Sequence, residues 1–377
     1  MGQPVVSNVA SPRCPACGAP GADTARFCVS CGSSLAQRTV PVTRPDIDAP
    51  RSKIRVFVTL AALSILLLAG AVAAVLRPWA PSSPVAILGH RDSVWSVAFS
   101  PDGRALATGS NDETARIWDV SSRRQIGDPL VHPDSVERVA FSPDGQILAT
   151  ASHDGVRLWN VGQHRQIGDP LGGLGPVTGI AFSPDGRVLA AAGYDDRTVR
   201  LWEVATHADV GTLTGHTDRV VAVAFSPDGR VLATGGYDGT ARLWDTASRS
   251  QLGKPLTGHT GWVYAVAFSP DGRMLATAGY HDRIVRLWDV ASQSQIGSLK
   301  TFDAGRVIAV AFSPDGHLVA VGGDDGTQLW NATNQRQIGP TLSPPDGAFG
   351  VAFSPDGHTL ATANYDKSAR LWHVPPG

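Results

Sequence analysis

The sequence predicts an all-β fold built from seven similar four-stranded units. The phrase Ala-Phe-Ser-Pro-Asp-Gly occurs seven times, and successive copies lie 41 to 44 residues apart. A recurrence this regular indicates one structural unit stacked side by side. Repeats made alike seldom build one asymmetric active site, so the pattern favours a binding scaffold over an enzyme. The phenylalanines of the seven copies are Phe99, Phe141, Phe182, Phe225, Phe268, Phe312 and Phe353.

One repeat shows how its strands are predicted. Residues 220–225 and 231–235 are short apolar runs joined by Ser-Pro-Asp-Gly, in which Pro at the second position and Gly at the fourth suit a type I turn. A Tyr-Asp-Gly turn leads to a third run at 241–244, and a fourth follows near 251–256. Short runs of period two between turn residues are strands of an antiparallel meander. Four such strands in about 42 residues make one blade of a β-propeller.

Composition places the chain among ordinary globular proteins but hides two unlike parts. The formal net charge is −1, so nothing global suggests nucleic acid as a ligand. Residues 56–76 contain no charge at all, whereas the remainder is polar in the ordinary way. Only four lysines stand against 28 arginines, and Ala, Gly and Pro are abundant, which favours a GC-rich, bacterial genome.

All four cysteines lie near the N-terminus in the spacing C-x2-C-x10-C-x2-C. Two CxxC turns can direct four thiolates at one point and close a tetrahedral site, which predicts structural zinc. The segment 12–33 resembles the short zinc ribbons common near the N-termini of bacterial membrane proteins. A pair of disulfides and a CxxC redox site are the alternatives. The predicted Zn²⁺ ligands are Cys14, Cys17, Cys28 and Cys31.

A membrane span is predicted at 56–76, after a basic, Pro-containing linker at 34–55. Twenty-one uncharged residues at about 1.5 Å each match a hydrocarbon core of about 30 Å. A cleaved signal peptide fits poorly, because the apolar run is long and begins far into the chain. A buried helix of a soluble protein would also be unusual with this composition.

The flanking charges predict the orientation of that span. Residues 1–55 carry seven Lys or Arg against three Asp, so the positive-inside rule places the N-terminus in the cytosol. The cysteines, which must stay reduced to bind zinc, then lie in the reducing compartment. We therefore expect a single-pass protein of the cell membrane, with a stiff Pro-rich spacer at 77–84 and an extracytoplasmic propeller at 85–377.

The repeats resemble the WD40 family over residues 85–377. The Trp-Asp dipeptide begins at Trp118, Trp244 and Trp288, and the Gly-His signature ends at His90, His216 and His259. The resemblance implies a seven-bladed β-propeller with a central channel. The chain reaches Gly377 just after the third strand of the last blade, and residues 84–88 are the candidate for its fourth strand. Such pairing would join the first and last blades without an open edge.

A His, a Thr, an Asp and a Trp recur at matching positions in four blades. A hydroxyl, an imidazole and a carboxylate could suggest a hydrolytic triad. The WD40 resemblance implies instead a buried chain of hydrogen bonds from Trp to Thr, His and Asp, and we expect no catalytic residue. The third, sixth and seventh blades lack the His, so we expect them to be the least rigid. The four tetrads are His90, Thr108, Asp112, Trp118; His132, Thr150, Asp154, Trp159; His216, Thr234, Asp238, Trp244; and His259, Thr277, Asp282, Trp288.

The resemblance also implies a binding face around the channel. Its residues flank the first apolar position of each innermost strand or precede the Asp of the second turn. Aromatic residues are frequent there, which suits anchors for a protein or peptide partner; the alternative is that some merely fill the ring. The expected partner contacts on this rim are Trp95, Trp262, Tyr264, Tyr237, Phe349, Tyr365, Arg219 and Arg306.

Two classes of function remain open at this point. The first is a membrane-anchored protein–protein interaction scaffold whose propeller docks a protein or peptide through its aromatic rim. The second is a small-ligand sensor or propeller enzyme that uses the central channel. Nucleic-acid binding by the ribbon is a weaker third option, because its basic residues are sparse.

Overall fold

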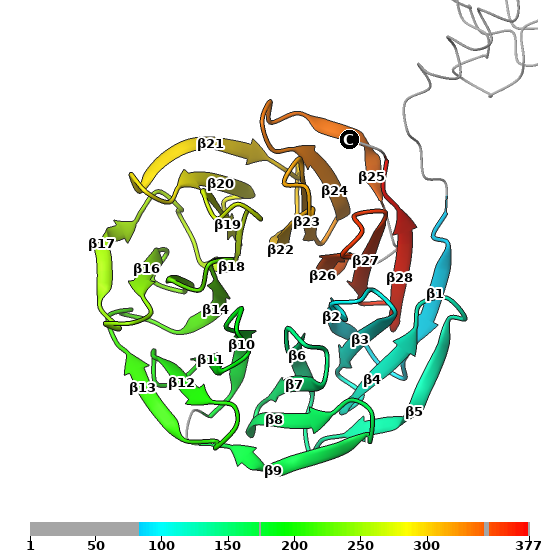
Figure 1. Cartoon of the computed structure of the whole chain (residues 1–377). Coiled ribbons are helices and arrows are strands. Elements are labelled where there is room, and N and C mark those ends of the chain that lie inside the picture. The colour runs from blue at the N-terminus through cyan, green and yellow to red at the C-terminus, as the bar shows by residue number, and fades with distance from the viewer. Residues whose placement is uncertain (1–82, 173–174, 343–346, 376–377) are drawn as a thin grey trace, which may run out of the picture. The chain divides into compact units, whose positions relative to one another are not determined.

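The computed structural model describes residues 83–172, 175–342 and 347–375. These residues form 28 strands in seven antiparallel sheets of four strands each. The sheets stand around a common axis as the blades of a propeller (Figure 1). The prediction of an all-β, seven-bladed propeller is therefore confirmed.

The blades follow the chain in order. Blade 1 contains β2 (Val94–Phe99), β3 (Ala105–Ser110), β4 (Thr114–Asp119) and β5 (Arg124–Val131); blade 2 contains β6 (Val136–Phe141), β7 (Ile147–Ser152), β8 (Gly155–Asn160) and β9 (Arg165–Leu171); blade 3 contains β10 (Val177–Phe182), β11 (Val188–Gly193), β12 (Val199–Glu203) and β13 (Asp209–Leu213). Blade 4 contains β14 (Val220–Phe225), β15 (Val231–Gly236), β16 (Ala241–Asp245) and β17 (Gln251–Leu256); blade 5 contains β18 (Val263–Phe268), β19 (Met274–Gly279), β20 (Ile284–Asp289) and β21 (Ser294–Lys300). Blade 6 contains β22 (Val307–Phe312), β23 (Leu318–Gly323), β24 (Gly326–Asn331) and β25 (Gln337–Leu342); blade 7 contains β26 (Ala348–Phe353), β27 (Thr359–Asn364), β28 (Ser368–His373) and β1 (Ala86–Gly89).

The hydrophobic core lies between neighbouring blades rather than within one of them. In one cluster Ile117 and Leu130 of blade 1 pack with Val136, Leu148 and Trp159 of blade 2. Both faces of each sheet are thereby covered, and the second strand of every blade is almost wholly buried. A single blade could not bury these residues alone, because each cluster takes residues from two blades.

The repeated phrase does more than turn the chain. The Ser226 hydroxyl donates to Asp228 Oδ1 at 2.7 Å and accepts from the Val231 N–H at 2.9 Å. Gly229 has φ of +72°, and a Cβ built there would lie 3.4 Å from Pro184 of the preceding blade. The same Gly–Pro proximity recurs at all seven junctions. The seven turns thus form a contact ring on one face of the propeller.

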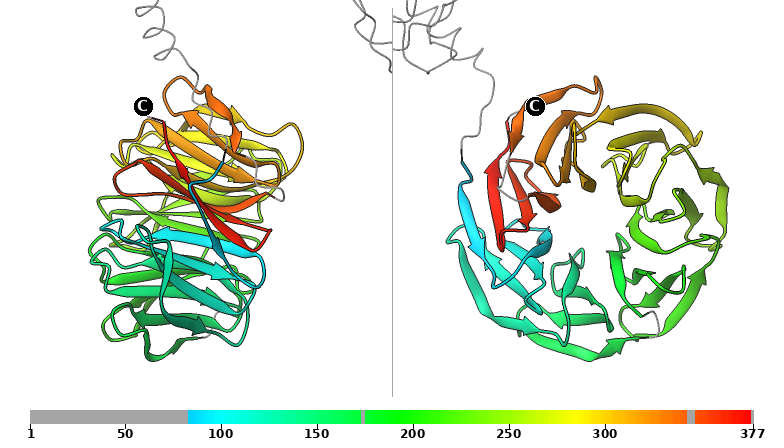
Figure 2. Two further views of the ribbon diagram at one scale, coloured as in Figure 1. Left: turned by 90° about the vertical axis from the view of Figure 1, so that its right-hand side faces the viewer. Right: turned by 180° about the vertical axis from the view of Figure 1, so that it is seen from behind.

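The last blade is closed by the first strand of the described chain. β1 pairs antiparallel with β28, with Ala86 opposite Leu371 and Gly89 opposite Ser368. Figures 1 and 2 show the cyan β1 beside the red β28. The predicted closure is confirmed, with the strand shifted from 84–88 to 86–89.

The predicted N-terminal parts lie outside the described residues. They are the zinc ribbon at 12–33, the linker at 34–55, the membrane span at 56–76 and most of the spacer at 77–84. In the part of the chain that the structure describes, no helix is long and apolar enough to cross a membrane.

Candidate functional site

Two sets of loops define one face of the propeller, here called the upper face. In blades 1, 3, 4, 5 and 6 the turn between the second and third strands donates a backbone hydrogen bond to the segment that leads into the innermost strand. The Tyr237 N–H donates to Arg219 O at 2.8 Å, and the Tyr280 N–H donates to Trp262 O at 2.8 Å. The Ser-Pro-Asp-Gly turns stand at the other end of the innermost strands and define the lower face.

An aromatic cluster spans blades 3, 4 and 5 on the upper face. It consists of Tyr194, Tyr237, Trp262, Tyr280 and Tyr264. The rings of Tyr237 and Trp262 are stacked, with centroids 3.9 Å apart and an interplanar angle of 2°. Tyr194 meets Tyr237 at 5.7 Å, and Tyr280 lies 5.1 Å from Trp262 and 4.9 Å from Tyr264. Packed rings of this kind form a preorganised apolar surface.

Two exposed arginines flank the aromatic cluster. The Arg219 guanidinium lies 4.4 Å from the Tyr194 ring centroid, and the Arg306 guanidinium lies 5.2 Å from that of Tyr280. Both distances are in the range of cation–π attraction. Arg306 also donates to the Tyr280 hydroxyl at 2.5 Å and to Asp324 at 2.7 and 2.8 Å. The hydrogen bonds to Asp324 hold the guanidinium in place beside the ring, and they also raise the pKa of Arg306.

A smaller aromatic group lies on blades 1 and 7. Trp95 and Phe349 meet at 4.5 Å, and Phe349 meets Tyr365 at 5.8 Å. Tyr365 is 55% exposed, whereas Phe349 is buried. The rim residues expected from the sequence therefore form two separate groups.

Three of the aromatic residues expected to contact a partner are less exposed than residues of an open binding surface would be. Trp95, Trp262 and Tyr264 are half-buried, and neighbouring rings cover Trp262 on both sides. The exposed members of the rim are Arg219, Arg306 and Tyr365, of which Arg306 is paired with Asp324. Their role in partner contact stays a prediction.

Sequence reasoning missed Tyr194 and Tyr280. It considered only the residue directly before the turn Asp, and these two tyrosines stand one position earlier because their turns contain one extra residue, Asp195 or His281. A signal was nevertheless present. Gly-Tyr recurs with its tyrosines at 194, 237 and 280, two steps of 43 residues. Equal steps in consecutive blades place side chains next to one another around a ring.

Three of the four expected tetrads are joined as the family pattern implies. In blade 1 the Trp118 Nε1–H donates to Thr108 Oγ1 at 2.9 Å, His90 Nε2 lies 2.6 Å from that oxygen, and His90 Nδ1 lies 3.0 Å from Asp112 Oδ2. Blades 4 and 5 repeat the geometry. Burial opposes ionisation of Asp112, but hydrogen bonds from His90, Thr114 and the Arg91 N–H outweigh it and hold its pKa well below the usual range.

In blade 2 the expected tetrad is wrong at the His–Asp step. His132 Nδ1 contacts Leu130 O at 3.0 Å, whereas Asp154 accepts from Arg157 at 2.6 Å. The turn between β7 and β8 is one residue shorter than in blade 1, which brings the arginine to three positions after the Asp instead of four. The shorter turn directs the carboxylate to Arg157 and leaves His132 buried without an acidic partner. The other two contacts of the tetrad are retained. The Trp159 Nε1–H donates to Thr150 Oγ1 at 2.9 Å, and His132 Nε2 lies 2.7 Å from the same oxygen.

The tetrads offer no open nucleophile. Thr108, Thr150, Thr234 and Thr277 are all 0% exposed, and each hydroxyl already contacts both a Trp and a His. A hydroxyl engaged in this way stabilises the fold and cannot reach a substrate. The geometry favours the structural role over the hydrolytic triad.

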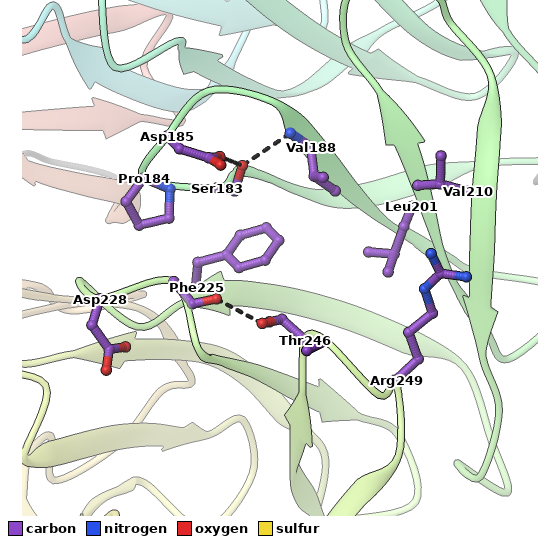
Figure 3. A pocket seen from close by; sticks show the side chains of 12 residues that line it. Ser183, Pro184, Asp185, Val188, Leu201, Val210, Phe225, Asp228, Thr246 and Arg249 are labelled. Carbon is purple, nitrogen blue, oxygen red and sulfur yellow. Dashed lines mark hydrogen bonds between the residues drawn. The ribbon is translucent and has the colours of Figure 1, made fainter.

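A cavity of about 500 Å³ opens on the lower face between blades 3 and 4 (Figure 3). Phe225, Leu201 and Val210 line it, together with Thr246 and Arg249. Thr246 stands where the other six blades have a small apolar residue, and its hydroxyl donates to Gly229 O at 2.7 Å. The equivalent apolar residues pack in the clusters at the other junctions, and they are Val120, Val161, Val204, Val290, Ala332 and Val374.

No group of three or more potential metal ligands occurs within residues 83–172, 175–342 and 347–375. The four predicted zinc ligands, Cys14, Cys17, Cys28 and Cys31, lie outside these residues.

Comparison with known proteins supports the two recognisable parts of the chain. Residues 13–35 match the zinc-ribbon domain. Residues 82–119 and 127–160 match the WD domain, G-beta repeat. Residues 176–375, more than half of the chain, match the family described as IFT122 first beta-propeller.

Curated relatives match over single repeats. A "Ribosome biogenesis protein BOP1 homolog" from Dictyostelium discoideum is 47% identical over 49 residues, which are 13% of this chain and 6% of that protein. A "Notchless protein homolog" from Arabidopsis thaliana is 56% identical over 34 residues, 9% of this chain and 7% of that protein. A "Probable cytosolic iron-sulfur protein assembly protein CIAO1 homolog" from Chlamydomonas reinhardtii is 58% identical over 40 residues, 11% of this chain and 10% of that protein.

These matches span a tenth or less of each relative's length, so they extend the evidence for the repeat and not for a shared activity. Together with the seven blades and the family match over residues 176–375, they establish what kind of protein this is. The chain belongs to the family of WD40-repeat proteins and carries a β-propeller of the IFT122 first-propeller type.

Proposed function

We propose that the propeller is a protein-interaction module that docks a protein or peptide on the aromatic cluster of its upper face. The observation that carries the proposal is the continuous packing of Tyr194, Tyr237, Trp262, Tyr280 and Tyr264 across three blades, flanked by exposed arginines. Tyr, Trp and Arg are the residues that most often dominate binding energy at protein interfaces. WD40 propellers are typically non-enzymatic scaffolds, which agrees with this role.

The rigidity of the cluster supports binding rather than mere filling of the ring. Rings held by stacking lose little side-chain freedom when a partner binds, so the entropy cost of binding is smaller. Arg306 is likewise held by Asp324 before any partner is present. A cluster that only filled the ring would not need exposed arginines at its border.

Site-specific photocrosslinking tests this proposal. A benzoylphenylalanine at His281, which is exposed and lies 4.8 Å from the Trp262 ring, should crosslink one discrete partner in the source cells. The same group at the exposed lower-face residue Arg273 is the matched control and should not. Trp262→Ala should abolish the crosslink from position 281. Equal labelling from both faces, or a crosslink that survives this substitution, would contradict docking on the cluster.

The alternative of a small-ligand sensor or propeller enzyme receives less support. The cavity described in the channel measures about 110 Å³. Cofactor and substrate sites usually occupy about 300 to 1,000 Å³. This cavity is smaller than that range, so it suits a side chain rather than a cofactor.

We also propose that Cys14, Cys17, Cys28 and Cys31 bind one structural Zn²⁺. The support is the four-thiolate spacing and the match of residues 13–35 to the zinc-ribbon domain. Elemental analysis of the purified full chain should give one zinc per molecule. Cys14→Ser with Cys17→Ser should remove the metal without lowering the unfolding midpoint of the propeller. Full zinc content in that variant would contradict the assignment.

Finally, we propose that residues 56–76 anchor the chain in the cell membrane, with the ribbon cytosolic and the propeller extracytoplasmic. The uncharged run of 21 residues and the excess of Lys and Arg before it support this topology. Protease added to intact cells should release the propeller and spare the ribbon. A propeller that is cut only after the cells are lysed would overturn the proposed orientation.

A further inference from the structure

One position on the innermost strands differs sharply between blades. It lies three residues before the phenylalanine of each repeated phrase. In blade 3 a Cβ at this position would lie 2.7 Å from Val221 O on the neighbouring innermost strand, so there is little room for a side chain. Blade 2 nevertheless carries Arg138. The other six residues are Ser96, Gly179, Ala222, Ala265, Ala309 and Gly350.

Arg138 extends into the central channel. It lines the cavity of about 110 Å³ together with Gly179, Ile180, Val221 and Tyr264. These residues come from β6, β10, β14 and β18, which are the innermost strands of four successive blades (Figure 1). Gly179 has no side chain to oppose the arginine at the same level of the next blade. Among the residues that line this cavity, Arg138 is thus the one cation, and the others are small or apolar apart from Tyr264.

The Arg138 guanidinium has no acidic partner among the described residues. Its Nη1 donates to Glu137 O at 2.8 Å, which is a main-chain carbonyl. The neighbouring Glu137 carboxylate is engaged elsewhere, accepting from the Ser135 hydroxyl at 3.0 Å and lying 3.7 Å from His153. A half-buried guanidinium with most of its five N–H donors free favours an added anion.

A second donor lines the same cavity. Burial raises the pKa of Tyr264, so its hydroxyl stays protonated at neutral pH and can donate. Above it on the rim, Arg219 is exposed and forms no ion pair with a described residue. Arg138 and Arg219 therefore offer positive charge to a ligand that enters from the upper face, and Glu137, which accepts from Ser135, is the neighbouring carboxylate.

We propose that Arg138 and Tyr264 form a subsite in the channel for the carboxylate of an Asp or Glu side chain of the docked peptide. The inference rests on the proposed function and names a feature of the partner. A water molecule occupies about 30 Å³ of liquid, so the cavity has room for a carboxylate and its methylene group but not for a nucleotide. The Arg138 guanidinium can form charge-assisted hydrogen bonds to a carboxylate, and the Tyr264 hydroxyl can donate a further hydrogen bond to it.

Peptide selection on the purified full chain provides the test. A phage library of random dodecapeptides is selected on the wild-type chain, and clones that lose binding to Trp262→Ala are kept as upper-face binders. The selected peptides are synthesised with either an amidated or a free C-terminus, and in each the acidic side chain is also replaced by its amide, Asn or Gln. The affinities of all these peptides are measured by fluorescence anisotropy. The chain variants are Arg138→Gln, Arg138→Lys and the control Arg104→Gln, whose side chain is 88% exposed on a lower-face turn.

We expect one fixed Asp or Glu in the selected peptides. Replacing that Asp or Glu by Asn or Gln in the peptide should weaken binding about tenfold or more, and so should Arg138→Gln in the protein. Both changes together should weaken binding no more than either one alone, because they remove the same contact. Arg138→Lys should retain part of the affinity, and Arg104→Gln should retain all of it. Equal unfolding midpoints would show that the variants fold.

The outcomes separate the two proposals. Upper-face peptides with no acidic preference, or with unchanged affinity for Arg138→Gln, would overturn the subsite and leave the docking surface standing. Binding only by the peptides with a free C-terminus would assign the carboxylate to that terminus and overturn the side-chain assignment. If no peptide depends on Trp262, the docking surface fails and the subsite fails with it.

Discussion

Hydrogen bonds between single side chains distinguish blades that otherwise share one pattern. In blade 1 the carboxylate of Asp112 accepts from His90, whereas in blade 2 Asp154 accepts from Arg157. One residue fewer in the turn produces this change, since it alters where the carboxylate points. A net hydrogen bond contributes only about 1 kcal/mol, but a buried group left without a partner costs about 1 to 3 kcal/mol. We therefore expect differences of one residue in these turns to change the free energy of unfolding.

His132 should make the propeller less stable in mild acid. Burial lowers its pKa from the ordinary value of 6.5 to about 4. Between these values the unfolded chain binds the proton and the native chain does not, so stability falls as the pH drops from 6.5 to 4 and this contribution levels off below 4. Over this pH range the free energy of unfolding should fall by about 3 kcal/mol on account of His132.

The measurement is urea unfolding of wild type and His132→Gln between pH 7.5 and 4. The slope of unfolding free energy against pH should be shallower in the variant. The tetrad Asp residues do not interfere, because their depressed pKa values move their contribution below pH 3.8. Parallel slopes in the two proteins would show that His132 is not held neutral in the native state.

Whole blades differ because the tetrad is complete in some and reduced in others. Blade 3 has Ala191 at the hydroxyl position, and blade 7 keeps Thr362, which accepts from Trp372 at 3.1 Å, but has no His. Blade 6 has Val321 there, and the Trp330 N–H donates instead to Gln328 Oε1 at 3.1 Å. Gln328 replaces an arginine found in the other blades, and sequence reasoning missed this local substitute.

Amide hydrogen exchange should rank the blades by their tetrads. We expect the second and third strands of blades 3, 6 and 7 to exchange faster than those of blades 1, 4 and 5, because fewer buried side-chain hydrogen bonds resist local opening. A deficit of about 1 to 2 kcal/mol corresponds to a factor of about 5 to 30 in exchange. Mass spectrometry of peptides from each blade gives the ranking, and uniform protection would contradict it.

Closure of the ring depends on four residues of β1. Leu88 is 2% exposed and packs in the cluster that joins blades 7 and 1, whereas Ile87 points outward and is 62% exposed. The strand alternation places these neighbours on opposite faces. Every blade contacts its two neighbours, so loosening the last junction affects the whole molecule.

Leu88→Ala should lower the unfolding free energy of the full chain by about 2 to 5 kcal/mol, as expected for a large-to-small change in a core. Ile87→Thr, which keeps a β-branched residue on the exposed face, is the matched control and should stay within about 0.5 kcal/mol. Urea titration followed by tryptophan fluorescence measures both. A similar effect of the two substitutions would mean that β1 does not close the ring by packing.

The sequence by itself determined the number of blades, the type of turn, the pairing that closes the ring and three of the four tetrads. These features follow from residue types at fixed spacing within one repeat, or from comparing equivalent positions in two repeats. Only the tertiary structure decided that Tyr194 and Tyr280 complete the aromatic cluster, that Asp154 turns to Arg157, and that Arg138 enters the channel. Those contacts join side chains of different blades or depend on a turn one residue longer or shorter. The contacts between blades arise when neighbouring blades pack, because only then do positions about 40 residues apart in the chain meet. The contacts within one blade depend on turn length, which decides where a side chain such as Asp154 points.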